Sequence, residues 1–216
     1  MDALDVRTFT VGQLQENCYL VRLKGAAVAV LIDPGDEAER LLEAIDALDV
    51  AIAAILLTHT HFDHVGAVAA LARATGAPVY CPILEREVLA DIDASVRPLG
   101  LSGFENYDAD ELLAGGEHLE LAGLAIDVHF TPGHSPGHLT YALPAHEALL
   151  VGDVLFRGSV GRVDLPGGDW TTLLDSIASL IDAYPPQTLV FPGHGPHTAL
   201  GAERETNPFL TELAAR

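Results

Sequence analysis

Four side chains of the kinds that bind metal ions lie within six consecutive positions of one short segment. The segment, LTHTHFDHVG, holds His59, His61, Asp63 and His64. Regular helix or strand geometry cannot turn all four to one side, but a tight loop after a strand can. Imidazole nitrogens and carboxylate oxygens are ligands that zinc, iron and manganese accept. Solvated loop histidines are the alternative, and we favour a metal site because so many ligand types follow directly on an apolar run.

So short a loop cannot supply every ligand of such a site, so we expect others from elsewhere in the chain. Three candidates each follow an apolar run and stand beside a glycine that permits a sharp turn. They are His134 in FTPGHSPGH, Asp153 in LLVGDVLF and His194 in LVFPGHGPH. This pattern at four strand ends predicts one shared site at one edge of the sheets.

The elements that must position these residues are visible as apolar patterns. Short runs rich in Val, Leu, Ile and Tyr predict strands, at Val6–Thr10, Asn17–Leu23, Ala27–Ile32, Ile52–Leu57, Val79–Cys81, Glu117–Leu121, Leu124–Phe130, Leu139–Ala142, Ala148–Val151 and Thr188–Phe191. Helical spacing predicts helices, at Glu37–Leu48, Val65–Ala74, Asp169–Ala183 with Asp169 as N-cap, and Gly201–Ala214 with a break near Pro208. Weak periodicity over Asp91–Glu111 predicts a surface excursion over one end of the sheets. The class is therefore α/β or α+β, with two sheets inside helices.

Composition narrows the class further. The chain has 216 residues, of which 49% are hydrophobic, so one domain over residues 1–216 with a large core is expected. The formal net charge is −20, and Lys24 is the only lysine, which disfavours nucleic-acid binding. Cys18 and Cys81 are expected as small core residues without a disulfide. The first ten residues do not resemble a signal peptide, and no apolar run is long enough for a membrane helix, so we expect a cytoplasmic protein without membrane contact.

The motif His-x-His-x-Asp-His, followed by a histidine, an aspartate and a second histidine, resembles the metallo-β-lactamase superfamily of hydrolases. The match holds at all seven positions, and the resemblance runs from NCYLV near the start to ERETNPFL near the end. It implies an αβ/βα four-layer sandwich, with two mixed sheets and helices on the outer faces. It also implies two divalent metal ions, zinc first, with iron or manganese as alternatives.

The resemblance also implies a role for each residue. The first metal would be held by His59, His61 and His134, the second by Asp63, His64 and His194, with Asp153 bridging them. A hydroxide bridging the metals would attack a carbonyl carbon, and Asp63 and Asp153 would be the catalytic carboxylates. Neighbouring hydroxyl and carboxyl groups would orient imidazoles, with Asp33, Thr58 and Thr131 as candidates. The remaining histidines are expected as surface or core filler, with His138 and His197 near enough to form pocket wall.

The segment Gly158–Asp169, with TPGHSPGH, resembles the glyoxalase II-like subgroup, which hydrolyses the thioester of hydroxyacylglutathione. Arg162 in this segment is our candidate for binding a substrate anion. Full-length members carry a C-terminal helical extension with basic residues for glutathione, whereas this tail offers Arg204 and Arg216. We therefore expect a small-molecule thioester, derived from glutathione or from a smaller thiol.

Other functions stay open at this stage. A persulfide dioxygenase shares the scaffold and a Gly-Arg-x-Asp stretch, here Gly161–Asp164, and would hold one iron by His59, His134 and Asp153. A lactonase or β-lactam hydrolase is less supported, and the charge disfavours a ribonuclease. A non-catalytic binding module on this scaffold is expected to lack ligands that are all present here. Both a monomer and a homodimer fit the sequence, with Asp91–Glu111 as a possible contact surface.

Overall fold

The computed structural model describes residues 3–211. Internal contacts divide the chain into two compact units. The first unit contains Met1–Leu113 and Glu120–Leu124, and the second contains Ala114–Leu119 and Ala125–Arg216. The single domain expected from the chain length stays a prediction.

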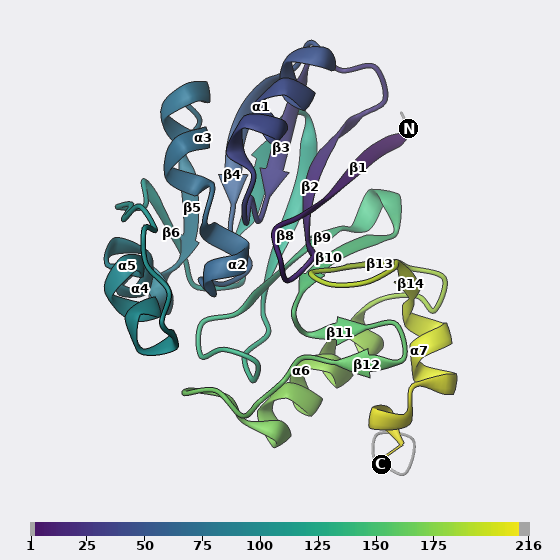
Figure 1. Cartoon of the computed structure of the whole chain (residues 1–216). Helices are drawn as coiled ribbons and strands as arrows, with labels where there is room; N and C mark the ends of the chain where they lie inside the picture. The colour runs from purple at the N-terminus through teal and green to yellow at the C-terminus, as the bar shows by residue number, and fades with distance from the viewer. Residues whose placement is uncertain (1–2, 212–216) are drawn as a thin grey trace. The chain divides into compact units, whose positions relative to one another are not determined.

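The first unit is built on a six-stranded mixed sheet with the order β1-β2-β3-β4-β5-β6 (Figure 1). Strands β1 to β3 pair antiparallel, and β3 to β6 pair parallel. The strands are β1 (Leu4–Val11), β2 (Glu16–Leu23), β3 (Val28–Ile32), β4 (Ala51–Leu56), β5 (Val79–Pro82) and β6 (Glu111–Leu113). The four parallel strands β3 to β6 therefore end at the same edge of the sheet. The metal-type loop, residues 57–66 with His59, His61, Asp63 and His64, follows β4 and lies between the segments that follow β3 and β5.

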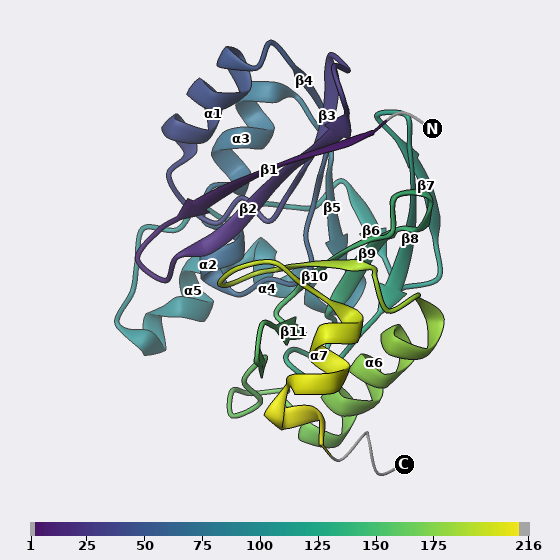
Figure 2. The same cartoon turned by 90° about the vertical axis from the view of Figure 1, so that its right-hand side faces the viewer.

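Helices cover one face of this sheet. Helices α1 (Ala38–Ala47) and α3 (Val68–Thr75) lie side by side against it (Figure 2). Their apolar residues recur every three or four positions, so Leu41, Ile45 and Leu71 face the strands and join one buried cluster. The shorter helices are α2 (Phe62–Val65), α4 (Arg86–Ala90) and α5 (Ile92–Val96), with 3₁₀ turns at Ile83–Glu85 and Arg97–Leu99.

The second sheet is also mixed, with the order β14-β13-β10-β9-β8-β7. Its strands are β7 (His118–Leu121), β8 (Leu124–Phe130), β9 (Leu139–Leu143), β10 (Ala148–Gly152), β13 (Leu189–Pro192) and β14 (Thr198–Ala199). A small ribbon of β11 (Leu155–Phe156) and β12 (Ser159–Val160) follows β10. Helices α6 (Trp170–Ala183) and α7 (Leu200–Thr206) pack with this unit, where Leu173, Ile177 and Leu180 of α6 enter the buried cluster.

These two large mixed sheets with helices confirm the predicted fold class. Every predicted strand is present within a residue or two at each end. The short helix α4 and the strands β6, β11, β12 and β14 were not predicted. These strands have two or three residues each, which is too short to show a hydrophobic period. Cys18 and Cys81 are buried and free, as expected.

Two expectations need correction. The helix predicted over Val65–Ala74 begins three residues later, as α3 at Val68, and the separate short helix α2 lies before it at Phe62–Val65. The segment Asp91–Glu111 is not wholly a surface excursion, because α5 buries Ile92 and Val96 in the core. The interruption or end predicted near Pro208 for the helix over Gly201–Ala214 is confirmed, because α7 ends at Thr206 and a 3₁₀ turn follows at Pro208–Leu210. Residues 212–214 of that range lie outside the described residues.

No helix within residues 3–211 has the length and apolar character needed to cross a membrane.

The N-cap of α6 gives a test of the fold. The Asp169 carboxylate accepts hydrogen bonds from the Thr172 N–H at 2.8 Å and the Thr172 hydroxyl at 2.7 Å. We expect Asp169→Ala to lower the free energy of unfolding by about 1 kcal/mol, the usual value of such a cap. Chemical denaturation measures it. Asp182→Ala, an exposed acid near the other end of α6, is the matched control and should cause no loss, because an acid there opposes the helix dipole.

Candidate functional site

The metal-type loop of the first unit lies between two buried carboxylates. Strands β3, β4 and β5 are parallel neighbours, so the segments that follow them share one edge. Asp33 follows β3, the loop follows β4, and Glu85 follows β5 by three residues. Asp33 and Glu85 are 2% and 3% exposed, so each needs hydrogen-bond donors from its surroundings.

Asp33 meets that need on one side of the loop. Its Oδ1 accepts the Thr58 N–H at 2.7 Å, and its Oδ2 accepts the Thr58 hydroxyl at 2.6 Å. The same Oδ2 lies 3.0 Å from Nδ1 of His64. An ionised carboxylate only accepts hydrogen bonds, so the proton of His64 is on Nδ1 and its Nε2 carries a lone pair. Asp33 therefore orients an imidazole, as expected from the sequence.

Asp33 also fixes the tautomer of His59, through the hydroxyl of Thr58. Because the Thr58 hydroxyl donates to Asp33, it accepts from Nδ1 of His59, which lies 3.0 Å away. Nε2 of His59 then carries a lone pair and lies 3.1 Å from Nδ1 of His61. Two ligand atoms about 2.0–2.1 Å from one tetrahedral metal are about 3.3 Å apart. His59 and His61 are thus spaced to bind a single ion.

Glu85 holds the loop from its other side. Its Oε2 accepts the Thr60 N–H at 2.7 Å and the Thr60 hydroxyl at 2.9 Å. Thr60 stands between His59 and His61, so this carboxylate fixes the backbone that carries both imidazoles. The sequence analysis missed Glu85, because it lies 25 residues from Thr60 in no recognisable motif, and only the β4–β5 pairing brings the two together.

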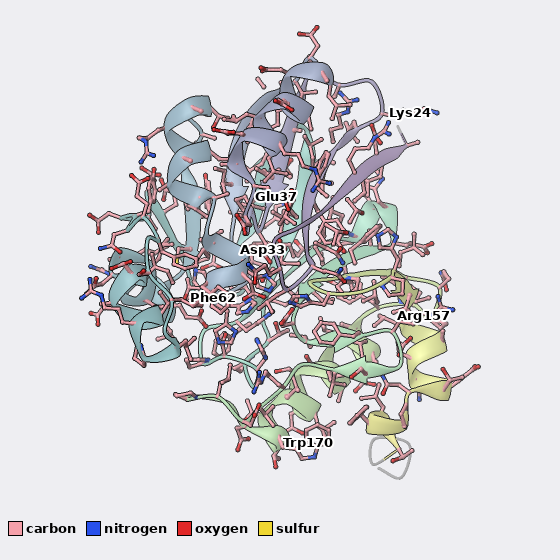
Figure 3. All side chains as sticks on the ribbon, viewed as in Figure 1. Lys24, Asp33, Glu37, Phe62, Arg157 and Trp170 are labelled. Atoms are coloured by element: carbon pink, nitrogen blue, oxygen red, sulfur yellow. The ribbon has the colours of Figure 1, made fainter. Side chains whose placement is uncertain are left out.

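Asp63 stands in the first turn of α2, where the His64 N–H bonds to the carbonyl of His61 at 2.9 Å. The backbone here passes very close to Gly35. A Cβ at Gly35 would lie 1.6 Å from the carbonyl oxygen of Asp63 and 2.7 Å from Oε2 of the buried Glu16. Only glycine fits at position 35, because any side chain there would push the backbone of Asp63 away. Figure 3 labels Asp33 and Phe62 beside this part of the first unit.

The second unit gathers the other three candidates. Strand β9 is antiparallel to both β8 and β10, and β10 is parallel to β13, so β8, β10 and β13 end at one edge. His134, Asp153 and His194 follow these ends. Oδ2 of Asp153 lies 3.5 Å from Nε2 of His134 and 3.6 Å from Nε2 of His194. One carboxylate oxygen thus faces two imidazole nitrogens, and each oxygen–nitrogen pair is close to the spacing of two ligands on one ion.

His134 is oriented by the backbone of the Gly-Arg stretch. Its Nδ1 donates to the carbonyl oxygen of Arg162 at 2.8 Å, which leaves a lone pair on Nε2. The neighbouring Gly161 allows this approach, since a Cβ there would lie 1.9 Å from the carbonyl oxygen of Asp153. Arg162 therefore contacts the candidate ligand His134 through its backbone carbonyl and not through its side chain.

The Arg162 side chain has another partner. Its guanidinium makes a bidentate ion pair with Asp164, at 2.7 and 2.8 Å, and is 60% exposed. This pairing lowers the pKa of Asp164 to about 2. A substrate anion would have to compete with that carboxylate, and the substrate-binding role of Arg162 stays a prediction.

His138 has a role that sequence reasoning missed. It is fully buried, and its Nε2 accepts the N–H of Asp153 at 3.1 Å. Its Nδ1 lies 3.2 Å from the hydroxyl of Thr131, which lies 3.0 Å from that of Thr140. Thr131 thus orients an imidazole, as expected, but one that positions Asp153 and is not itself among the predicted ligands. His138 directly follows Pro136-Gly137, as His134 follows Pro132-Gly133, so the sequence does not distinguish this supporting histidine from a ligand.

Other histidines have partners of ordinary kinds. His118 pairs with Asp127, His129 hydrogen-bonds the hydroxyl of Tyr184, and His197 packs on the ring of Phe191. Burial lowers the pKa of His129 and of His197. These contacts agree with the expected filler role.

Histidine and carboxylate side chains gathered in each unit, with Nε2 lone pairs on His59, His64 and His134, are typical of a protein that binds divalent metal ions. Residues 11–194 match the family described as the metallo-beta-lactamase superfamily. The chain belongs to this superfamily of metallo-hydrolases.

Curated relatives match along nearly their whole length. The chain is 40% identical to the probable metallo-hydrolase YqgX of Bacillus subtilis, over 94% of this chain and 96% of that protein. It is 34% identical to the hydroxyacylglutathione hydrolase GloC of Haemophilus influenzae, over 96% and 98%.

Solved structures agree. BLEG-1, a B3 metallo-β-lactamase, has a TM-score of 0.90 and 41% identity, over 96% of this chain and 100% of that chain. TTHA1623 in a di-iron-bound form has a TM-score of 0.84 and 46% identity, over 95% and 100%. ETHE1 from Myxococcus xanthus has a TM-score of 0.79 and 26% identity, over 94% and 83%.

Glu85 provides a test of the loop's support. We expect Glu85→Ala to weaken metal affinity about 10- to 100-fold, the usual effect of removing a group that orients ligands. Glu85→Gln should keep most of the affinity, because the amide oxygen can still accept from Thr60. Competition with a chromophoric chelator measures this. Parent-like affinity in Glu85→Ala would show that the carboxylate does not hold the loop.

Proposed function

We propose that this protein is a thioester hydrolase that works with two divalent metal ions. One ion would be held by His59, His61 and His134, and the other by Asp63, His64 and His194. Asp153 would bridge the two. The substrate would be a small-molecule thioester, either derived from glutathione or built on a smaller thiol.

The observation that carries this proposal is the position of Oδ2 of Asp153 between two imidazoles. A carboxylate oxygen 3.5 and 3.6 Å from the Nε2 atoms of His134 and His194 is placed to contact two ions. Each imidazole would offer a different ion its lone pair.

When bound, the two ions would supply an activated water as nucleophile and would stabilise negative charge on the carbonyl oxygen. The chain's own groups do the rest. Asp33 fixes the ring proton of His64 on Nδ1 directly and that of His59 on Nδ1 through Thr58, so Nε2 of each neutral imidazole carries a lone pair. His138 fixes the backbone of Asp153. Asp63, besides binding metal, would accept a hydrogen bond from the attacking water.

The thioester assignment draws support from the relative named hydroxyacylglutathione hydrolase, which matches over 96% of this chain. For the metals we propose zinc, with iron or manganese as alternatives, since histidine and carboxylate ligands suit all three. A relative solved in a di-iron-bound form supports keeping iron among them.

The second candidate is a persulfide dioxygenase. It would use one iron, held by His59, His134 and Asp153 as two histidines and a carboxylate. The likeness to ETHE1 from Myxococcus xanthus, at 26% identity, is the observation that favours it.

Metal content separates the two. Elemental analysis of protein made in metal-balanced medium should give two metals per chain, with hydrolysis of acyl thioesters. One iron per chain, with oxygen consumption on glutathione persulfide and no thioester hydrolysis, would replace the proposal with the dioxygenase.

Asp153 gives the corresponding mutational test. We expect Asp153→Ala to reduce bound metal below two per chain and to lower kcat/KM about a thousandfold, because several kcal/mol of transition-state stabilisation are lost. Elemental analysis and thioester kinetics on the same sample measure both. Asp182→Ala, an exposed carboxylate on α6, is the control and should match the parent. Two bound metals with full turnover in Asp153→Ala would contradict the bridging role.

Arg162 can be tested with its partner. If its guanidinium binds a substrate anion, Arg162→Ala should raise KM for carboxylate-bearing thioesters about two- to fivefold, the effect of one exposed ion pair. Asp164→Asn should lower that KM, because it frees the guanidinium. Neutral thioesters should change little in either variant. Equal effects on charged and neutral substrates would remove Arg162 from the substrate site.

A further inference from the structure

A pocket of about 290 Å³ opens within the first unit beside Asp63. Its walls are mostly apolar, with Val11, Leu14, Phe62, Leu101 and Phe104 among the lining residues. Small-molecule sites usually begin at about 300 Å³, so the pocket suits one part of a ligand better than a whole drug-sized molecule. No residue of this pocket other than Asp63 is among the proposed ligands.

Charge narrows what this pocket can hold. Asp36 and Asp63 are the charged residues among the described lining, and no Arg, Lys or His is among them. A substrate carboxylate placed here would meet the like charge of Asp36 and no Arg, Lys or His side chain, because Asp63 would be occupied by a metal ion. An uncharged group meets no such penalty and removes apolar surface from water.

The first wall is the turn between β1 and β2, and it is anchored to the start of α1. Oε1 of Glu37 accepts the Gly12 N–H at 3.0 Å. Arg40 binds Oε2 of Glu37 at 2.6 Å and the carbonyl of Thr10 at 3.0 Å. Leu14 is 53% exposed at the tip of this turn, so an apolar side chain faces solvent on a braced segment. Glu37 is labelled in Figure 3.

The second wall is the segment 101–104, packed on α2. The rings of Phe62 and Phe104 meet edge to face, with centroids 5.7 Å apart. Oδ1 of Asp93 accepts the Gly103 N–H at 2.8 Å, while its Oδ2 pairs with Arg97 at 2.7 Å. Leu101 is 36% exposed. This segment is thus held in place although it has no regular secondary structure.

From these observations we infer that the pocket binds an uncharged, apolar group of the substrate. The inference rests on the proposed function, because it takes the pocket beside Asp63 as the specificity site of the same reaction. The apolar group would belong either to the acyl part or to the thiol part of a thioester. A group ending in a carboxylate would be rejected.

The test is a panel of thioesters in two arms, assayed with the metal-loaded protein. The acyl arm contains acetyl, butanoyl, hexanoyl and adipoyl thioesters of N-acetylcysteamine. The thiol arm contains acetyl thioesters of ethanethiol, butanethiol, hexanethiol and 6-mercaptohexanoate. In one arm kcat/KM should rise about twofold to fourfold per methylene, the upper value corresponding to about 0.8 kcal/mol per buried CH₂. The chain ending in a carboxylate should lose this gain.

Variants connect the effect to the pocket. Leu101→Arg should abolish the gain with chain length and shift preference toward the carboxylate-bearing chain by roughly tenfold, because it adds a cation to the wall. Leu14→Arg should act in the same way from the other wall. Leu99→Arg is the matched control, since Leu99 is an exposed leucine two residues away that does not line the pocket. All three positions are exposed, so the core is left intact.

A binding experiment keeps this inference separate from the proposed function. The S-hexyl thioether of N-acetylcysteamine cannot be hydrolysed, and calorimetry should show that it binds the parent and Leu99→Arg but not Leu101→Arg. The same pattern without thioester turnover would support the pocket and overturn the hydrolase. Turnover without any chain-length gain in either arm, and without thioether binding, would overturn the pocket and leave the hydrolase standing.

Discussion

One buried carboxylate governs the protonation of the metal-type loop. Asp33 accepts two hydrogen bonds from Thr58 and faces Nδ1 of His64, and the hydroxyl of Thr58 is thereby left to accept from His59. Because a carboxylate cannot donate, the direction of every bond in this chain is fixed. Glu85 adds the complementary constraint, since it holds the backbone of Thr60 between the two imidazoles. The parallel arrangement of β3, β4 and β5 matters to function mainly because it places these two carboxylates on either side of the loop.

The sequence predicts the strands well and offers seven candidate ligands at strand ends, for physical reasons. Buried strands such as β4 are continuous apolar runs, and ligand residues follow them beside glycines that allow a sharp turn. The groups that support the ligands are harder to predict. Glu85 and His138 act through contacts between residues that are distant in sequence. The Arg162 group that contacts His134 is a backbone carbonyl, which every residue has, so no sequence pattern can mark it. The close approach of the Gly35 carbonyl to Gly66 is equally hard to predict, because it joins residues 31 positions apart.

The pocket of the first unit and the metal-type loop share Phe62 and Asp63, and the pocket residue Gly35 lies against the same loop. Because the backbone of Gly35 packs on the carbonyl of Asp63, a change at one of these positions would move the other. With the proposed roles of the pocket and of Asp63, substrate preference and metal binding would be coupled at this point of the chain. The walls of the pocket are more independent, because Glu37 with Arg40 braces one and Asp93 with Arg97 braces the other.

The fixed tautomers of His59 and His64 have a consequence for how well the ligand side chains are ordered without bound metal. In many small metalloproteins the ligands become ordered only when the ion arrives, so loss of the ion unfolds the chain. Here the imidazoles are oriented by Asp33 and Thr58, and the loop by Glu85, through bonds that involve no metal. We therefore expect this half of the ligand set to stay assembled when an ion leaves. One metal would then replace another without refolding, so the bound ion would depend on which metals the surroundings supply.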